Sequence, residues 1–156
     1  MPLSYDSISY QSKEIIDYKY DICFIGGFAD NGFNEKIKNM QEMLGAFVES
    51  GLKCGFSVNG NVSHKIENSV LNESKVSLNI HDLYQRVVGL DSNERTFKSL
   101  GCNGLLLCDD VKQVKELFPF CYCSNSSKDL IDKAKEYCKI EINKINKIKK
   151  QKKKYI

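Results

Sequence analysis

No apolar run in this sequence reaches the roughly 20 residues that a helix needs to cross a bilayer, so we expect no transmembrane segment. The opening residues MPLSYDSISYQSKE lack a basic stretch followed by an apolar one, so they do not resemble a signal peptide. The cysteines form no CxxC pair, and the CxC of Cys121 and Cys123 has no matching motif or nearby histidine. We therefore expect no bound metal.

The seven cysteines are an odd number, which disfavours a disulfide framework. Four of them lie within apolar segments, where a reduced thiol packs as a small hydrophobe: Cys23, Cys54, Cys102 and Cys108. Together with the missing export signal, this predicts a cytoplasmic protein in a reducing compartment.

A chain of 156 residues with 42% hydrophobic and 28% charged residues is typical of one soluble globular domain. The net charge of +3 is unevenly distributed, because residues 139–156 hold eight lysines and one acid and residues 1–138 are therefore at −4. Such a basic tail can bind nucleic acid or an anionic membrane. It can equally be a solubilising helix end, which we favour because the tail has no arginine and a single aromatic residue, Tyr155.

Five short apolar segments are typical of buried β-strands, at 20–27, 53–58, 75–80, 104–108 and 120–123. Helical spacing follows the first of them, with Asn34 as the N-cap, Gly51 as the end, and one face made by Ile37, Met40, Leu44, Phe47 and Val48. A short helix is expected at 64–71, and residues 81–92 are expected to form a loop.

Asp91 is the expected N-cap of a helix over 92–101, with Glu94 completing a capping box. A short helix over 111–118, capped by Asp110 and closed by Pro119, should come next. One long final helix should begin at Ser126 or Ser127 and carry the apolar stripe Ile131, Ala134, Cys138, Ile142, Ile145 and Ile148.

Strands that alternate with helices predict an α/β fold, a single Rossmann-like, doubly wound parallel sheet. The expected organisation is a lead-in segment at 1–19, the domain at 20–138, and a basic helix end at 139–156. Ligands of such sheets bind beyond the carboxyl ends of the strands.

Gly26 and Gly27 follow the first strand, where they can admit a phosphate close to the backbone or simply form a turn. The pattern is neither GxGxxG nor a P-loop with its lysine, which disfavours those two classes of nucleotide site.

Residues Asn93, Glu94, Arg95, Thr96, Phe97 and Lys98 open a helix. Free amides at a helix amino terminus favour anions, Arg95 offers a fork of donors matched to phosphate oxygens, and Lys98 lies one turn further on the same face. These groups can hold a diphosphate and stabilise it as a leaving group, or they can be a solvated surface face.

His81 directly follows the third strand and can serve as an acid, a base or a hydrogen-bond donor, or simply as a structural histidine. Asp109 follows the fourth strand and can bind a hydroxyl group or cap the next helix.

Residues 77–118 resemble the group-1 glycosyltransferase domain of spore-maturation-like proteins. The matching elements are Leu78-Asn79-Ile80-His81, Asn93-Glu94-Arg95-Thr96-Phe97, Gly101-Cys102-Asn103-Gly104 and Asp109-Asp110, and YDICFIGG (20–27) looks like the family's first strand. The resemblance covers residues 20 to about 138.

The resemblance implies the carboxyl-terminal half of a GT-B glycosyltransferase, which binds a nucleotide-sugar donor and works without a metal or other cofactor. By position, Gly26 and Gly27 would lie near the diphosphate and Arg95 would contact it. Asn79 and His81 would face the sugar or the acceptor, with His81 as the candidate catalytic residue.

Two departures from the family pattern leave alternatives open. Lys98 stands where many members have a glutamate that accepts hydrogen bonds from the ribose, and the earlier member of the acidic pair of retaining enzymes would fall at Leu90. The length fits only one of the two GT-B domains, so a partner chain can supply the acceptor half. The sequence thus favours a transferase domain, then a non-catalytic module that binds a nucleotide-like ligand or a protein, and last a nucleic-acid or membrane binder.

Overall fold

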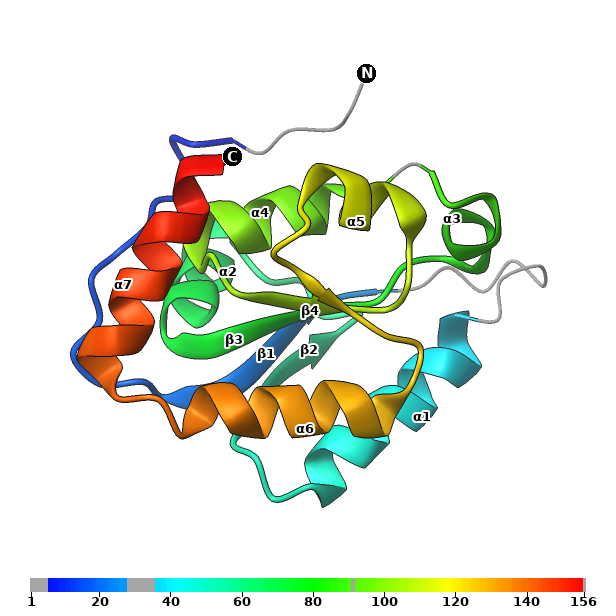
Figure 1. Ribbon diagram of the computed structural model, residues 1–156, viewed down its shortest axis with the longest axis horizontal. Coiled ribbons are helices and arrows are strands. Elements are labelled where there is room, and N and C mark those ends of the chain that lie inside the picture. Colours follow the sequence, from blue (N-terminus) through cyan, green and yellow to red (C-terminus); the bar gives the residue numbers. More distant parts are fainter. Residues whose placement is uncertain (1–5, 28–35, 91, 156) are drawn as a thin grey trace.

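The computed structural model describes residues 6–27, 36–90 and 92–155. The described residues form one five-stranded, all-parallel sheet in the order β2-β1-β3-β4-β5 (Figure 1). The strands are β1 (Tyr20–Gly26), β2 (Cys54–Val58), β3 (Ser74–Asn79), β4 (Leu106–Cys108) and β5 (Tyr122–Cys123). Each lies within or one residue beyond the segment that the apolar runs predict, so the α/β, Rossmann-like class is confirmed.

The chain reverses its direction of winding at β1. From β1 it crosses to β2 on one side, and from β2 it returns past β1 to β3 on the other. Ile22 of β1 is accordingly paired with Cys54 of β2 and with Val76 of β3. The space beyond the carboxyl ends of β1 and β3 is therefore the switch point, where open α/β sheets bind ligands.

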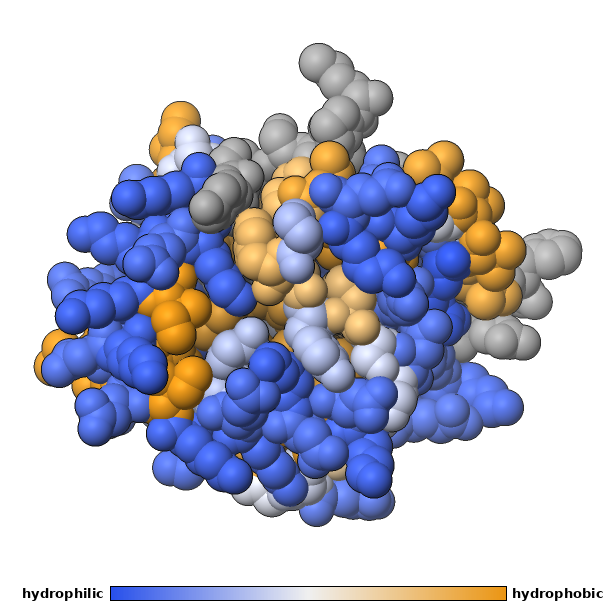
Figure 2. Space-filling model, viewed as in Figure 1, coloured by the Kyte–Doolittle hydropathy of each residue, from blue (hydrophilic) through white to orange (hydrophobic). Residues whose placement is uncertain are grey.

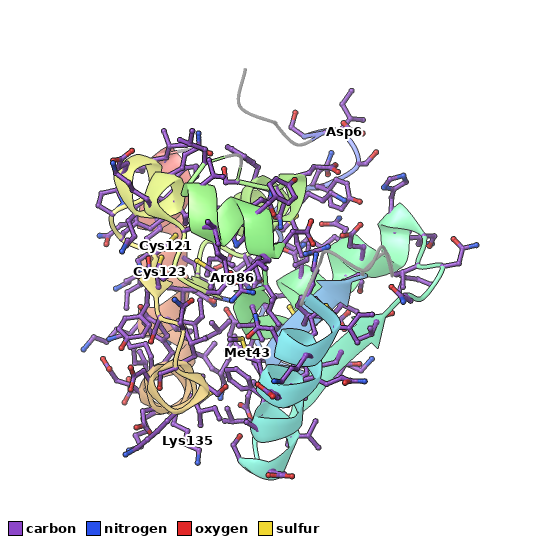
Figure 3. The ribbon with its side chains drawn as sticks, turned by 90° about the vertical axis from the view of Figure 1, so that its right-hand side faces the viewer. Asp6, Met43, Arg86, Cys121, Cys123 and Lys135 are labelled. Atoms are coloured by element: carbon purple, nitrogen blue, oxygen red, sulfur yellow. The ribbon has the colours of Figure 1, made fainter. Side chains whose placement is uncertain are left out.

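Helices cover both faces of the sheet. They are α1 (Lys36–Glu49), α2 (His64–Asn72), α3 (Leu83–Val88), α4 (Glu94–Cys102), α5 (Lys112–Leu117), α6 (Ser127–Cys138) and α7 (Ile142–Lys152), followed by a 3-10 turn over Lys153–Tyr155. In Figures 1 and 3, α1 and α6 lie together on one side of the sheet, and α4 and α5 lie on the other. Met43 of α1 points to the sheet, whereas Lys135 of α6 points to solvent.

The main core lies between the sheet and the α1–α6 layer. Its largest fully buried side chains include Phe24 of β1, Phe47 of α1 and Leu130 of α6. Ile145 of α7 belongs to the same cluster and has no exposed surface. The basic segment that begins at residue 139 is thus packed against the domain.

Three expectations about elements are wrong. Residues 83–88 form α3, which has a capping box between Asp82 and Gln85 and ends at Gly89 in the left-handed region (φ 74°). The expected long final helix is divided into two helices, since Lys139 is the C-cap of α6 and Glu141 is the N-cap of α7. Val48, expected on the apolar face of α1, is 61% exposed.

The caps are partly as expected. Ser126 caps α6 by accepting a hydrogen bond from the Asp129 amide, as predicted. Asp110 does not cap α5, because the N-cap of this helix is Val111. The Asp110 carboxylate pairs with Lys115 instead. The expected N-caps Asn34 and Asp91 lie outside the described residues.

The visible surface is mostly hydrophilic, with a hydrophobic patch over α3 (Figure 2). Val87 and Val88 are 76% and 62% exposed there. None of the helices among the described residues is both long and apolar enough to span a membrane.

Candidate functional site

A pocket of about 550 Å³ lies beyond the carboxyl ends of β1 and β2 and beside the amino terminus of α4. Its volume is within the usual range for small-molecule sites. The lining residues are Ile25, Gly26, Gly27, Asn59, Gly60, Val62, Glu67, Asn93, Glu94, Arg95 and Lys98.

The structure divides the predicted site residues into two groups. Six of them line the pocket: Gly26, Gly27, Asn93, Glu94, Arg95 and Lys98. The other four are fully buried behind it: Asn79, His81, Thr96 and Asp109. The sequence placed all ten residues at one edge of the sheet, but it did not separate side chains that line the pocket from those buried behind it.

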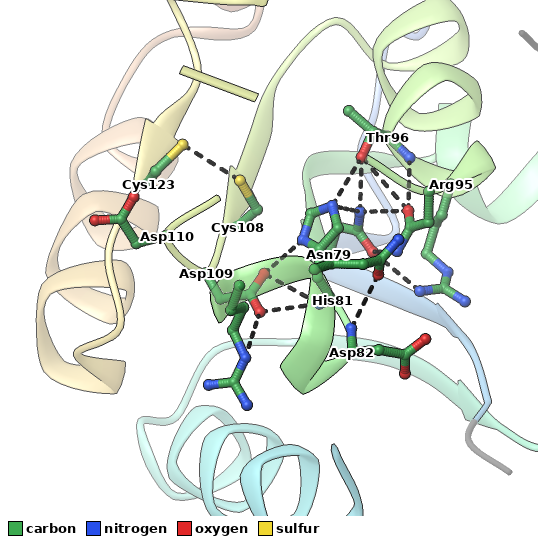
Figure 4. Close-up of polar contacts among 12 residues, drawn as sticks. Asn79, His81, Asp82, Arg95, Thr96, Cys108, Asp109, Asp110 and Cys123 are labelled. Carbon is green, nitrogen blue, oxygen red and sulfur yellow. Dashed lines mark hydrogen bonds and ion pairs between the residues drawn. The ribbon is translucent and has the colours of Figure 1, made fainter. Parts of the chain in front are cut away.

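Arg95 is the half-buried cation of this pocket. Its Nη1 donates to Oδ1 of Asn79 at 3.0 Å (Figure 4). Its guanidinium lies 5.2 Å from the centre of the Phe24 ring. Within the described part of the chain, no carboxylate lies within 4.0 Å of this group. Burial lowers the pKa of Arg95 from its ordinary value, yet an arginine stays protonated. Arg95 therefore presents a positive charge with no direct ion-pair partner among the described residues, and its charged form is favoured by the more distant carboxylates of Glu67, Asp82, Glu94 and Asp109.

Gly26 leaves the room that Arg95 occupies. A Cβ atom built on Gly26 would overlap the guanidinium group. We expected Gly26 to let a phosphate approach the backbone. In this structure, the guanidinium of Arg95 occupies that space instead. The Asn59 side chain lies in the same way against Gly27.

Asn79, at the end of β3, fixes Arg95 from behind. Its Nδ2 donates to Oδ1 of Asn93 at 2.8 Å and to Oγ1 of Thr96 at 2.9 Å, and its Oδ1 accepts from Arg95 (Figure 4). The buried amide is thereby satisfied on both ends, which a buried polar group requires. It connects the end of β3 to the first turn of α4.

His81 is fully buried and held by Asp109. The Asp109 carboxylate accepts from the His81 backbone amide at 2.9 Å and from Nδ1 at 2.7 Å. The proton between Nδ1 and the carboxylate belongs to Nδ1 because a carboxylate only accepts, and Nε2 faces Thr96 Oγ1 and Asn79 Nδ2, each at 3.3 Å. Arg86 Nε lies 3.5 Å from the other oxygen of Asp109. The structure thus does not bring His81 to the surface of the pocket.

The amino terminus of α4 opens into the pocket. Asn93, rather than the expected Asp91, is the residue before the helix, and its Oδ1 accepts from the Thr96 amide at 3.2 Å. This cap leaves the amides of Glu94 and Arg95 without an acceptor among the described residues. The partial positive charge of the helix end therefore lies beside the guanidinium of Arg95.

Lys98 is held by carboxylates, contrary to the expectation that it offers a free positive charge to phosphate. Its Nζ lies 3.4 Å from Glu67 of α2 and 3.4 Å from Glu94, and 4.8 Å from the centre of the Tyr10 ring. Burial and the hydrogen bond to Glu67 raise the pKa of Tyr10.

Sequence reasoning missed Glu67 and Tyr10 at this site, whereas Asn59 was expected near it as a residue that follows the second strand. Glu67 and Tyr10 are far from Lys98 in the chain, and no local pattern joins them. Asn59 carried a signal, since asparagine tolerates the left-handed region, where it lies here (φ 52°). Within the described residues, no group of three or more metal-binding side chains is suited to holding an ion.

A comparison with curated proteins finds no match. A model of the glycosyl transferase-like family matches residues 32–154. The match begins before α1, runs to the 3-10 turn after α7, and includes β2–β5 and the polar residues around Arg95. Because it covers most of the chain, this protein belongs to the glycosyl transferase-like family.

Proposed function

We propose that the pocket binds the diphosphate of a nucleotide-sugar donor, and that the chain is the donor-binding half of a metal-independent glycosyltransferase of the spore-maturation-protein-like type. The observation that carries the proposal is Arg95: a guanidinium without a carboxylate partner, fixed by Asn79 and placed beside the open amides of α4. A diphosphate supplies the charge that this arrangement lacks. In transfer, the same groups stabilise the departing nucleotide diphosphate.

The buried predicted residues receive positioning roles in this proposal. His81 and Asp109 hold Thr96, and Asn79 holds Arg95, so that the donors keep a fixed geometry toward the ligand. We therefore withdraw the catalytic role from His81, because a side chain with no exposed surface does not reach the sugar. Gly26 and Gly27 shape the wall of the pocket, and Asn93 and Glu94 form its rim.

The proposal includes a partner for the acceptor. The chain provides one Rossmann-like sheet, and a GT-B reaction takes place in a cleft between two such domains. We propose that a partner chain or further domain contributes the acceptor half. The seven cysteines are all free, which supports a reducing, cytoplasmic setting for this reaction.

The test is thermal unfolding with a panel of nucleoside diphosphates and their sugar conjugates. A ligand at 100 times its dissociation constant adds about 2.7 kcal/mol, which raises the melting temperature by roughly 5–10 °C for a domain of this size. We expect one base to give this shift, Arg95→Ala to abolish it, and Arg95→Lys to recover only part of it. Lys128→Ala, which removes an exposed cation from α6, is the control and should keep the full shift.

An unchanged shift in Arg95→Ala would show that nucleotides bind elsewhere, and the site would then be wrong. The absence of a shift with every nucleotide in the panel would overturn donor binding itself.

A second function is favoured by the lack of a free acid or base among the described residues that line the pocket. Its two carboxylates, Glu67 and Glu94, both pair with Lys98, and His81 is buried behind the pocket. The alternative is a non-catalytic module that captures a nucleotide-like ligand or a protein partner. Release of sugar from a nucleotide-sugar by the purified chain, lost in Arg95→Ala, would rule this alternative out. Binding without turnover, even with a sugar acceptor present, would favour it.

A further inference from the structure

A second cavity, of about 620 Å³, lies between α7 and the segment that leads into β1. It is at the opposite end of the sheet from the candidate donor pocket, because Lys149 in its wall donates to the backbone oxygen of Ser74, the first residue of β3. In Figure 1 the two segments run side by side, away from the end of the sheet where α3 lies. The family resemblance assigns no role to this cavity.

The lining of this cavity is strongly basic. Five lysines contribute to it, and Glu14 is its single acidic residue. The lysines are Lys13, Lys147, Lys149, Lys150 and Lys153. No carboxylate in the described part of the chain lies within 4.0 Å of any of their ammonium groups. Asn143 and Asn146 also line the cavity.

Lys149 is the buried member of the group, with 5% of its surface exposed. Its Nζ donates to the Ser74 carbonyl at 2.7 Å and lies 4.3 Å from the centre of the Tyr18 ring. Burial and the nearby charge of Lys153 lower the pKa of Lys149 well below its ordinary value. The charged form of Lys149 is therefore costly in this environment, and an anion in the cavity would offset that cost and favour the ammonium.

We propose that this cavity binds a small, multiply phosphorylated anion. Several phosphates held close together match several lysines that surround one hollow, whereas a single phosphate would leave most of them unpaired. A partly open cavity of this volume accepts a short polyphosphate or a phosphorylated ring. A nucleic acid or a membrane does not enter it, and the lining offers no arginine and no exposed aromatic side chain for stacking on bases.

The site is separate from the proposed donor pocket. Its lysines come from α7 and the segments beside it, whereas Arg95 and its supports come from β3 and α4. The two sites share no lining residue. We infer a regulatory or stabilising ligand, because a group bound at the amino ends of the strands is remote from a sugar at the carboxyl ends.

The experiment is calorimetric titration of the full chain with tripolyphosphate and with inositol hexakisphosphate, using inorganic phosphate as the weak comparison. The variant is Lys147→Gln with Lys150→Gln, since both side chains are exposed and the fold does not depend on them. The control is Lys139→Gln with Lys144→Gln, which removes the same charge from exposed positions of the same basic segment outside the cavity. We expect the cavity variant to bind at least about tenfold more weakly and the control to bind within about twofold of the parent.

The Arg95→Ala variant should bind both polyanions as the parent does, so failure of the donor site and failure of this site are distinguishable. Equal losses in the two lysine variants would indicate diffuse attraction to the basic segment and would overturn the proposal. So would the absence of polyanion binding. Binding of an oligonucleotide or of phosphatidylserine vesicles without binding of either polyanion would overturn it in favour of a surface interaction.

Discussion

The position of the Arg95 guanidinium depends on the absence of a side chain at Gly26. Because a Cβ at position 26 would occupy the place of the guanidinium, Gly26→Ala should push Arg95 away from Asn79. We expect this variant to remain folded and to lose nucleotide binding about as fully as Arg95→Ala does. Thermal shift with the preferred nucleotide measures the effect.

The matched control for this substitution is Gly45→Ala in α1, where an added Cβ meets no atom within 4 Å. An alanine in a helix interior should stabilise the chain by about 0.5–1 kcal/mol and leave nucleotide binding unchanged. Full nucleotide binding by Gly26→Ala would show that the position of Arg95 does not matter to the ligand.

The chemistry open to a polar residue at the edge of the sheet depends on whether its side chain is buried. The sequence alone does not predict that burial. The positions of the strands and helices predict that three residues lie near one another at this edge: Asn79, His81 and Arg95. Whether each faces the pocket depends on tertiary partners. Asp109 is 28 residues from His81 in the chain, yet its carboxylate holds the imidazole in the interior, away from the pocket surface.

At the scale of elements, β1 is tied at its start by a carboxylate. Asp21 accepts from the Lys53 amide at 2.9 Å and from Lys75 Nζ at 3.2 Å, so it links β1 to β3 and to the residue before β2. Burial opposes the charged form, but these two donors lower the pKa of Asp21 below its ordinary value. Its contribution to stability therefore requires the ionised carboxylate.

Asp21→Asn should lower the free energy of unfolding by about 1 kcal/mol at neutral pH. Because the folded-state pKa is depressed, the stabilisation is present above the unfolded pKa of about 3.9 and is lost as the pH falls through the folded value. The difference between parent and variant should thus be constant from about pH 7 to 5 and shrink below about pH 4. Urea unfolding at a series of pH values measures it, with the exposed Asp17→Asn as control. A difference that grows toward low pH would contradict the assignment.

The elements that sequence predicts well are those with a complete local signal. Each strand is a short apolar run, and α2 and α4 begin and end within two residues of their expected ranges. The sequence did not predict helix α3, because this helix has only six residues and exposes Val87 and Val88 to solvent. Its apolar residues therefore do not follow a helical period. Its capping box and Gly89 were the available signals. The break between α6 and α7 has no proline or glycine to mark it.

At the scale of the whole molecule, α7 is part of the core, although its lysines suggested a solvated end. Ile145→Ala should destabilise the chain by about 2–5 kcal/mol, because it leaves a cavity between α7 and the main core. Ile16→Ala, at a side chain that is 90% exposed, should change stability by less than about 0.5 kcal/mol. Chemical denaturation measures both, and equal effects would show that α7 does not depend on this contact.

The strand β3 lies between the two proposed sites. Its first residue, Ser74, accepts from Lys149 in the basic cavity, and the side chain of its last residue, Asn79, accepts from Arg95 in the donor pocket. Six strand residues span about 17 Å, so the two anchored ends are too far apart for the two phosphates of one diphosphate to bridge. A nucleotide and a polyphosphate should consequently bind to the chain at the same time, each with a stoichiometry of one. Arg95→Ala should remove the nucleotide alone, and the Lys147 and Lys150 variant should weaken the polyphosphate alone.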